Sequence, residues 1–249
     1  MEDTTFTEDK IHEPGEMSFL DHLEELRWRI IYAMIGVVIG TIICWVFSDF
    51  LITKILLAPA LKAGIKLQNL RPFGQIMLYF EIALVGGAVL SLPNLIYQLW
   101  KFIEPALRQS EKKYISAIVL FTTFCFLAGI AFAYFVMLPM TFGFAASFGT
   151  KAIENNFAVD EYLSIIVSIM LGAGVVFELP MLSFFLSKIG ILKPRLMKHY
   201  RKHAIVVIMI LSAFLTPGTD PVSQLVLAVP LVFLYEISIF VSKMSQRKS

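Results

Sequence analysis

The chain has 249 residues, of which 57% are hydrophobic and 16% are charged. A soluble domain of this length needs a more polar surface, so the composition indicates a membrane protein. The formal net charge of +2 is too small for a nucleic-acid-binding protein, and the basic residues lie between apolar blocks instead of forming one long patch.

The first residues of the chain are polar and acidic. They lack the basic and apolar regions of a cleaved signal peptide and the composition of an organelle transit peptide. We therefore expect the first apolar block to remain as a membrane helix and the protein to lie in a bacterial inner membrane. Over residues 18–29, apolar side chains recur at helical spacing, among them Phe19, Leu23 and Leu26. This pattern predicts an amphipathic helix on the cytoplasmic surface that continues into the membrane.

A membrane-spanning helix needs about 20 apolar residues. Six segments of one membrane domain, residues 1–249, are candidates: 30–47, 73–99, 115–137, 162–186, 204–215 and 222–241. The fifth is short, since its apolar stretch covers about 18 Å at 1.5 Å per residue, against a hydrocarbon core of about 30 Å. It must thin the bilayer, pack deep inside the bundle, or extend its basic start at Arg201 and Lys202 into the interface.

Lys and Arg residues are distributed unevenly between the two sides of these spans. Of the 21 in the chain, sixteen lie on the side of the N-terminus and five on the other side. Because cytoplasmic loops carry the excess of basic residues, both termini are predicted to be cytoplasmic. The long first connection on the outer side, residues 48–72, contains Pro59 and Gly64 and is predicted to form a structured cap.

Motifs for catalysis are missing from the sequence, which has no phosphate-binding loop, no HExxH and no GxSxG. We therefore expect neither enzyme activity nor a cofactor. Cys44 and Cys125 lie inside apolar blocks and are interpreted as small buried hydrophobic residues. His199 and His203 have the i, i+4 spacing of a metal pair on a helix, but the basic residues around them disfavour a divalent cation, so no metal site is predicted.

Glu178 lies inside the fourth apolar segment, where an ionised carboxylate costs about 2.5 to 3.5 kcal/mol on insertion scales. On a helix it shares a face with Glu161, Ser164 and Ser168, so we expect a polar stripe along this span. Pro180 removes a backbone donor and leaves a carbonyl free for another group. Two interpretations remain: a protonated glutamic acid that is hydrogen-bonded inside the bundle, or a water-lined or partner-binding site.

Two further carboxylates lie near the cytoplasmic surface. Glu25, in HLEELRWR, is placed to form an i, i+4 ion pair with Arg29, worth about 0.3 to 0.5 kcal/mol on a helix. Glu111 follows Ser110 at the expected start of the third span, where a carboxylate interacts favourably with the helix dipole. From the residues alone, each glutamate could have either this structural role or a role in binding.

At these residues the chain resembles the TatC family, the polytopic component of the twin-arginine protein translocase. Six collinear stretches carry the resemblance: HLEELRWR, the Pro59 region, LPNLIYQLWKFIEPALRQSEKKY, FAYFVMLPMTFGF, FELP and LTPGTDPVSQLVLAVPLVFLYE. They cover most of the chain in the right order. The resemblance implies an all-α polytopic membrane fold of six helices in a concave arrangement, with a short fifth and a short sixth helix.

The resemblance further implies a component of Sec-independent protein export. Such a protein binds twin-arginine signal peptides at the cytoplasmic face and nucleates the assembly that exports folded proteins with the proton-motive force. The implied partners are the single-span proteins TatA and TatB, further copies of TatC and the lipid bilayer. A folded cargo of about 100 residues has a radius of gyration of about 13 Å, too wide for six helices to enclose, so these partners must build the passage.

The resemblance also assigns residues to signal recognition. Glu25 and Glu111 match the carboxylates that recognise the arginine pair, and Arg27 and Phe102 match positions beside them. An arginine presents a planar fork that binds a carboxylate through two parallel hydrogen bonds, which a lysine lacks. Glu24 adds a second carboxylate next to Glu25, so the pattern leaves open which of the two pairs with a guanidinium.

The other matched positions lie away from the cytoplasmic surface. Pro59 and Asp220 match outer-side positions that are important for transport, and Glu178 matches the intramembrane polar residue of the concave face. Glu81 in the second span matches no motif. The main alternative is a proton-coupled secondary transporter of a small solute that uses Glu178, although the sequence lacks the inverted repeats and paired broken helices usual in such carriers. A membrane scaffold without signal recognition is a third interpretation.

Overall fold

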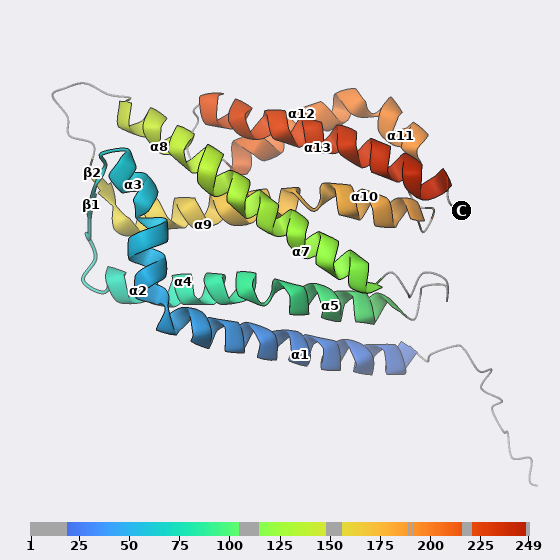
Figure 1. The fold of residues 1–249 in the computed structure, drawn as a ribbon, viewed down its shortest axis with the longest axis horizontal. Coiled ribbons are helices and arrows are strands. Elements are labelled where there is room, and N and C mark those ends of the chain that lie inside the picture. The colour runs from blue at the N-terminus through green and yellow to red at the C-terminus, as the bar shows by residue number, and fades with distance from the viewer. Residues whose placement is uncertain are drawn as a thin grey trace, which may run out of the picture.

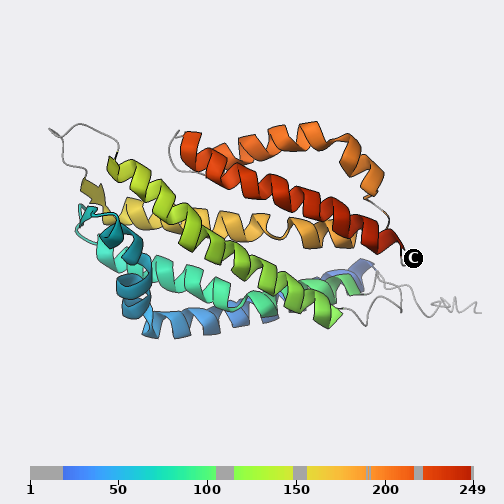
Figure 2. The ribbon, with the colours of Figure 1, turned by 45° about the horizontal axis from the view of Figure 1, so that its top comes forward.

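The structure is a computed structural model that describes residues 19–104, 115–147, 156–188, 190, 192–215 and 221–247. Nearly all of these residues are helical. The long helices lie roughly side by side, and α7 (Ile115–Phe132) crosses them diagonally (Figures 1 and 2). The start of α1 (Phe19–Val46) and the end of α13 (Pro221–Arg247) lie at one end of the bundle, called the terminal end below, and the opposite end is called the cap end.

Helix α1 joins two predicted segments. Its 28 residues include the predicted amphipathic segment from Phe19 onward and the first span as far as Val46. The sequence contains no proline there that would interrupt the helix. Many of its apolar side chains are exposed, for example Ile42 and Val46. Lipid tails are as apolar as these side chains, so this surface of α1 suits contact with the bilayer.

The second predicted span is a bent pair of helices. α4 (Gly74–Leu90) and α5 (Leu92–Ile103) meet at an angle of 54°. Pro93 lacks the N–H group that would continue the helical hydrogen bonds across this point, and the Ser91 hydroxyl donates to the carbonyl oxygen of Ala88 at 3.1 Å. The bend redirects α5 along the terminal half of α1, against which it packs.

The third predicted span is longer than the sequence indicates. α7 continues through a π-helical turn, η3 (Ala133–Met137), into α8 (Leu138–Ser147), so that one helical segment covers 33 residues. The π-helical turn lies just before Pro139, whose missing N–H would interrupt a regular α-helix. The wider turn lets the helix pass the proline and reach the cap end.

The fourth predicted span is broken at Glu178. α9 (Val159–Val176) ends two residues before Glu178, and α10 (Leu179–Lys188) begins one residue after it. Pro180 offers no N–H to the last turn of α9, and the N–H of Glu178 bonds the carbonyl oxygen of Val175 at 3.1 Å in a tighter turn. The intramembrane glutamate therefore lies at a helix break and not on a continuous helical face.

The fifth and sixth predicted spans differ in length. A short helix, α11 (Pro194–His199), precedes α12 (Arg201–Leu215), whose 15 residues extend about 22 Å at 1.5 Å per residue. α12 is short, as expected. α13 has 27 residues and continues past Val241, so the expectation of a short sixth helix is corrected. α13 packs along both α10 and α12.

The connection between the first and second predicted spans forms a compact cap. Its elements are α2 (Ser48–Phe50), the π-helical η1 (Leu51–Leu56), α3 (Ala58–Lys62) and β1 (Lys66–Gln68). β1 pairs in parallel with β2 (Asn156–Ala158), which directly precedes α9. Gly64 takes a φ of 70° in the turn between α3 and β1, a conformation that glycine adopts without strain. The predicted structured cap is thus present.

Within the described residues, four helical segments are long and apolar enough to cross a membrane: Leu20–Val46, Ile115–Ser147, Val159–Lys188 and Gln224–Met244. The bent pair of α4 and α5 makes a fifth if it counts as one span. These lengths indicate a multi-pass membrane protein, with α12 left as the short candidate for a sixth span.

Glycines allow the helices to approach closely at two crossings. Where α1 meets α4, a Cβ atom on Gly40 would lie 2.5 Å from the carbonyl oxygen of Gly87. Where α7 meets α9, a Cβ atom on Gly129 would lie 2.6 Å from the carbonyl oxygen of Ala173. Small residues at such crossings let helix backbones pack together inside a membrane. α9 carries several fully buried side chains, such as Ile166, and forms the centre of the core.

Candidate functional site

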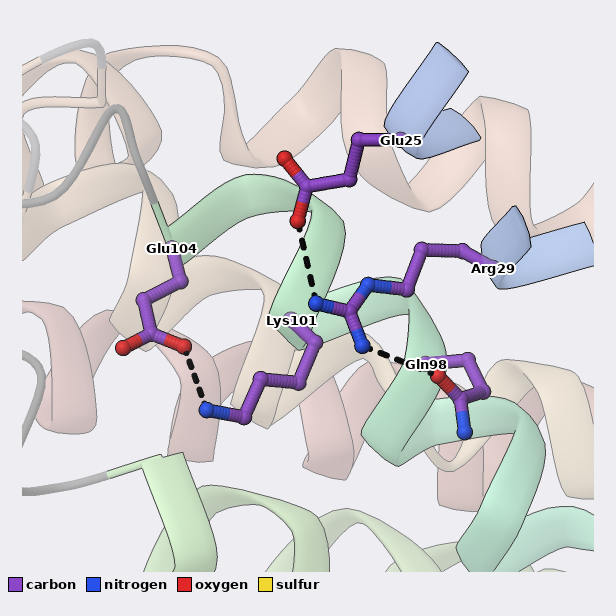
Figure 3. A network of polar contacts seen from close by, with 5 residues as sticks. All are labelled: Glu25, Arg29, Gln98, Lys101 and Glu104. Atoms are coloured by element: carbon purple, nitrogen blue, oxygen red, sulfur yellow. Dashed lines mark hydrogen bonds and ion pairs between the residues drawn. The ribbon is translucent and has the colours of Figure 1, made fainter. Parts of the chain in front are cut away.

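The polar residues at the terminal end gather along the seam between α1 and α5. Glu25 and Arg29 lie one turn apart on α1, and the Arg29 Nη2 donates to Glu25 Oε1 at 3.0 Å (Figure 3). The Arg29 Nη1 donates to Gln98 Oε1 of α5 at 3.4 Å. The side chains of Glu25 and Arg29 are 20% and 27% exposed, so the pair is sheltered but open to the surface. The i, i+4 pair predicted for Glu25 is confirmed.

A chain of hydrogen bonds continues from this pair along the seam. The Gln98 Nε2 donates to Asn94 Oδ1 at 3.3 Å, and the Asn94 Nδ2 donates to the carbonyl oxygen of Tyr32 at 3.1 Å. Gln98 lies one turn after Asn94 on α5, so the helix aligns the two amides on the same side. These hydrogen bonds extend from Glu25 along the seam and connect α5 to α1 at two points.

Phe102 lies at the same seam. Its ring stacks on that of His22, with ring centres 4.4 Å apart and planes inclined by 16°. His22 precedes Glu25 by three residues, which places both on the face of α1 that turns toward α5. The structure therefore brings Glu25 and Phe102 to one face, from two helices far apart in the sequence.

A second ion pair lies beside the first. The Lys101 Nζ and the Glu104 Oε2 are 2.8 Å apart; Lys101 lies in the last turn of α5, and Glu104 directly follows the helix (Figure 3). Their side chains are partly exposed. This pair places another carboxylate and another cation within the same surface as Glu25 and Arg29.

Arg27 lies on a different side of α1. Two residues along a helix correspond to a rotation of about 200°, and Arg27 is 64% exposed. Its guanidinium lies 3.8 Å from Glu24 and over the ring of Trp28, 5.3 Å from the ring centre. Glu24 and Arg27 thus share the outer surface of α1, whereas Glu25 faces the seam. Of the two neighbouring glutamates, Glu25 is the one that is linked to α5, through Arg29 and Gln98.

Two predicted site residues, Glu111 and Asp220, lie outside the described residues. Both remain predictions from the resemblance.

Glu178 occupies the break between α9 and α10 with its side chain partly buried. Its Oε1 atom is buried and has no hydrogen-bond partner in the described part of the chain. The remaining residues of the predicted polar stripe, Glu161, Ser164 and Ser168, are all exposed along α9. A row of exposed polar groups on an apolar helix indicates contact with water or with a polar partner and not with lipid.

Pro59 is buried in α3, where the cap meets the bundle. The neighbouring Ala60 N–H donates to the hydroxyl oxygen of Tyr162 at 3.0 Å, and that hydroxyl donates to the carbonyl oxygen of Leu56 at 2.8 Å. Tyr162 is fully buried. The hydroxyl thus holds both sides of the turn that contains Pro59.

Three of these residues were missed from the sequence. Gln98, Glu104 and Tyr162 each contact a functional candidate or its neighbour. The i, i+4 spacing of Asn94, Gln98 and Phe102 gives a signal for a polar edge on α5. Nothing comparable marks Tyr162, because its partners lie over 100 residues earlier in the chain.

Among the described residues, no group of three His, Cys, Asp or Glu side chains is arranged to hold a metal ion. His199 and His203 each pack edge-on against Tyr200 between them. Cys44 and Cys125 are free thiols.

Comparison with known proteins identifies the family. Residues 21–230 match the family model of the Sec-independent protein translocase protein (TatC). The chain is 35% identical to the protein of that name from Carboxydothermus hydrogenoformans, over 95% of this chain and 97% of the relative, and 39% identical to that from Helicobacter pylori, over 90% and 86%. A crystal structure of the twin arginine translocase receptor TatC superposes with a TM-score of 0.78 at 34% identity, covering 90% of this chain and 99% of that chain. The chain therefore belongs to the TatC family.

Proposed function

We propose that this protein receives twin-arginine signal peptides at its terminal end and nucleates the assembly that exports folded proteins. The observation that carries the proposal is the seam of α1 and α5, where Glu25 and Phe102 share one partly sheltered face. The family match supports it, since a matching structure bears the name of the twin arginine translocase receptor. In this proposal Glu111 is the second carboxylate of the site.

Charge chemistry explains why such a face selects arginine. Hydrogen bonds to charged groups contribute about 1.5 to 3 kcal/mol each when they are sheltered from water, whereas exposed ion pairs contribute about 0 to 1 kcal/mol. Glu25 is only 20% exposed, so the free energy contributed by a guanidinium bound there falls between these two ranges. The planar fork of arginine makes two bonds to a carboxylate, and the point charge of lysine does not.

The apolar part of a signal peptide requires a second surface. A cavity of about 510 Å³ lies between α1, η1, α4, α7 and α9, and nearly all of its lining is apolar. Its position among apolar helices suits it to hydrocarbon groups inside the membrane. In this proposal the paired arginines dock at the α1–α5 seam, while the apolar segment enters the bilayer beside the bundle.

Crosslinking tests the receptor role. A photoreactive residue placed beside the arginine pair of a precursor should crosslink to wild-type protein, and Glu25→Ala or Glu111→Ala should lower the yield. Glu161→Ala, an exposed carboxylate near the cap end, is the matched control and should leave the yield unchanged. A twin-lysine precursor should crosslink weakly to all variants. Full crosslinking in the Glu25→Ala/Glu111→Ala double variant would remove the site assignment.

The proposed topology has six spans, with α12 as the fifth, and both termini in the cytoplasm of a bacterial cell whose inner membrane holds the protein. The basic bias of the sequence supports this orientation, as does the common end of α1 and α13 (Figure 1). Single cysteines test it after Cys44 and Cys125 are replaced by alanine. A cysteine in the tail should be labelled from the cytoplasm and one at position 149 from outside; labelling of both from the same side would contradict the proposal.

Partners complete the proposed machine. TatA, TatB and further TatC copies would build the passage, and the proton-motive force would drive it. The exposed Glu161, Ser164 and Ser168 form a polar surface on α9 that supports a partner role for this helix. Glu178, beyond the end of α9, adds a buried oxygen without a partner among the described residues. The alternative of a small-solute transporter receives no support, because the relatives are translocase proteins over nearly the whole chain.

A further inference from the structure

Arg29 already occupies the carboxylate that the proposed function assigns to the signal peptide. Its Nη2 lies 3.0 Å from Glu25 Oε1, and its Nη1 lies 3.4 Å from Gln98 Oε1 (Figure 3). One guanidinium thus bridges α1 and α5 across the centre of the candidate site. Glu25 is the acceptor on one side of it and Gln98 on the other.

The pair leaves bonding capacity unused on both partners. Glu25 Oε2 and Arg29 Nε are both buried, and neither has a hydrogen-bond partner among the described residues. A carboxylate binds a guanidinium fork best through both oxygens at once. Arg29 contacts only one oxygen, so the internal pair is weaker than the pair that a correctly oriented external arginine could form.

An incoming arginine meets Arg29 directly. Two parallel bonds to Glu25 require Oε1 as well as Oε2, and Oε1 is held by the Arg29 Nη2. Two guanidinium groups on the same oxygen would also repel each other. The two-bond geometry therefore needs Arg29 to move away from Glu25, and its existing bond to Gln98 offers a place where it can remain.

From this geometry we infer that Arg29 is an internal competitor for the arginine-binding carboxylate, so that signal binding is an exchange of partners at Glu25. The inference rests on the proposed function, because it assigns a regulator to that same site. Arg29 keeps Glu25 neutralised in the empty receptor and yields only to a ligand that makes more than one bond.

The salt dependence of signal-peptide affinity distinguishes an exchange of partners at Glu25 from binding of the peptide to a free carboxylate. When an external guanidinium replaces Arg29, one ion pair forms at Glu25 and one is lost, so the affinity depends weakly on ionic strength at this position. When Arg29 is absent, the ligand forms a new ion pair, and salt screens a partly exposed pair of this kind. A residue that merely held Glu25 in position would not produce this change.

The test measures binding of a synthetic twin-arginine signal peptide to full-length protein at low and at high salt. We expect Arg29→Gln to raise the affinity about two- to fivefold at low salt, the range that corresponds to a partly exposed ion pair, and to steepen the salt dependence. Arg29→Lys keeps the charge but lacks the fork, and should give a smaller gain. Arg201→Gln is the matched control, since Arg201 of α12 forms a partly exposed ion pair with Glu236 of α13, outside the candidate site, and it should give no gain.

Variants of Glu25 distinguish the competitor role of Arg29 from the receptor role of the site itself. Adding Glu25→Gln to Arg29→Gln should abolish the gain, because the carboxylate for which Arg29 competes is gone. If Glu25→Gln alone weakens binding but Arg29→Gln and Arg29→Lys lower the affinity or leave it unchanged, Arg29 is no competitor, and the receptor site stands without it. If Glu25→Gln leaves binding intact in both backgrounds, the site assignment fails and the competitor role fails with it.

Discussion

The hydroxyl of the fully buried Tyr162 donates a hydrogen bond to the carbonyl oxygen of Leu56 at 2.8 Å and so ties α9 to the cap. The same oxygen accepts the N–H of Ala60 at 3.0 Å. Two other contacts support this attachment, an ion pair of 3.0 Å between Arg71 and Asp160 and the parallel pairing of β1 with β2. The cap and the start of α9 therefore form one unit, with the turn at Pro59 held inside it.

Replacing Tyr162 tests how much this hydroxyl contributes. Tyr162→Phe keeps the ring but leaves a buried carbonyl oxygen and a buried N–H without partners, which costs about 1 to 3 kcal/mol. We expect a lower midpoint of thermal unfolding and weaker export, since the Pro59 turn loses its support. Tyr200→Phe removes an equivalent hydroxyl from an exposed tyrosine and serves as control. Equal midpoints for the two variants would show that the hydroxyl does not stabilise the cap.

The crossing of α7 and α9 gives a second stability prediction. A Cβ atom on Gly129 would lie 2.6 Å from the carbonyl oxygen of Ala173, so Gly129→Ala forces the helices apart and should cost about 1 to 3 kcal/mol. Gly143→Ala is the matched control, because a Cβ atom there meets nothing within 4 Å. Thermal unfolding of both variants in the same detergent measures the difference. A Gly129→Ala protein as stable as Gly143→Ala would mean that the crossing is loosely packed.

Sequence reasoning recovered the local part of this architecture. Apolar length predicted the helical segments, and i, i+4 spacing predicted the pair of Glu25 and Arg29, because both depend on neighbours within a few residues. The 54° bend at Pro93 and the break at Glu178 were missed as breaks, since a proline inside an apolar run does not reveal whether the helix bends or ends. Broken helices are thus present in the described residues, and of the two sequence grounds against a transporter only the missing inverted repeats remain. The family match decides against a transporter.

Contacts between residues far apart in the chain could not be predicted from the sequence. Gln98 lies 69 residues after Arg29, and Tyr162 lies 106 residues after Leu56. No spacing rule connects such pairs, because only the packing of α5 on α1 and of α9 under the cap brings them together. The length of α13 was also underestimated, since its last turns are polar and carry no hydropathy signal although they remain helical.

The stack of Phe102 on His22 predicts how the receptor face responds to aromatic changes. Phe102→Leu removes an aromatic pair worth about 0.5 to 1.5 kcal/mol and loosens the surface beside Glu25, so signal-peptide affinity should fall about two- to tenfold. Phe102→Tyr keeps the ring and should keep most of the affinity. Phe80→Leu removes a comparable exposed pair, that of Phe80 with Trp45 at 4.7 Å, and should leave binding unchanged. Similar losses in Phe102→Leu and Phe80→Leu would count against a local role of Phe102.

Replacing Glu178 should affect export without affecting the docking of precursor. Glu178 lies at the break between α9 and α10, with Oε1 buried and without a partner among the described residues, so this oxygen can bond a partner or water that arrives during transport. We expect Glu178→Ala to bind precursor normally but to lose partner contacts or export, and Glu178→Gln to retain more export because the amide still offers hydrogen bonds in the same volume. Glu161→Gln, an exposed change on the same helix, indicates whether any carboxylate of α9 has this effect. Precursor crosslinking and export are measured side by side for the three variants. Normal export by Glu178→Ala would mean that the break is a structural feature of the span, and that its glutamate takes no part in transport.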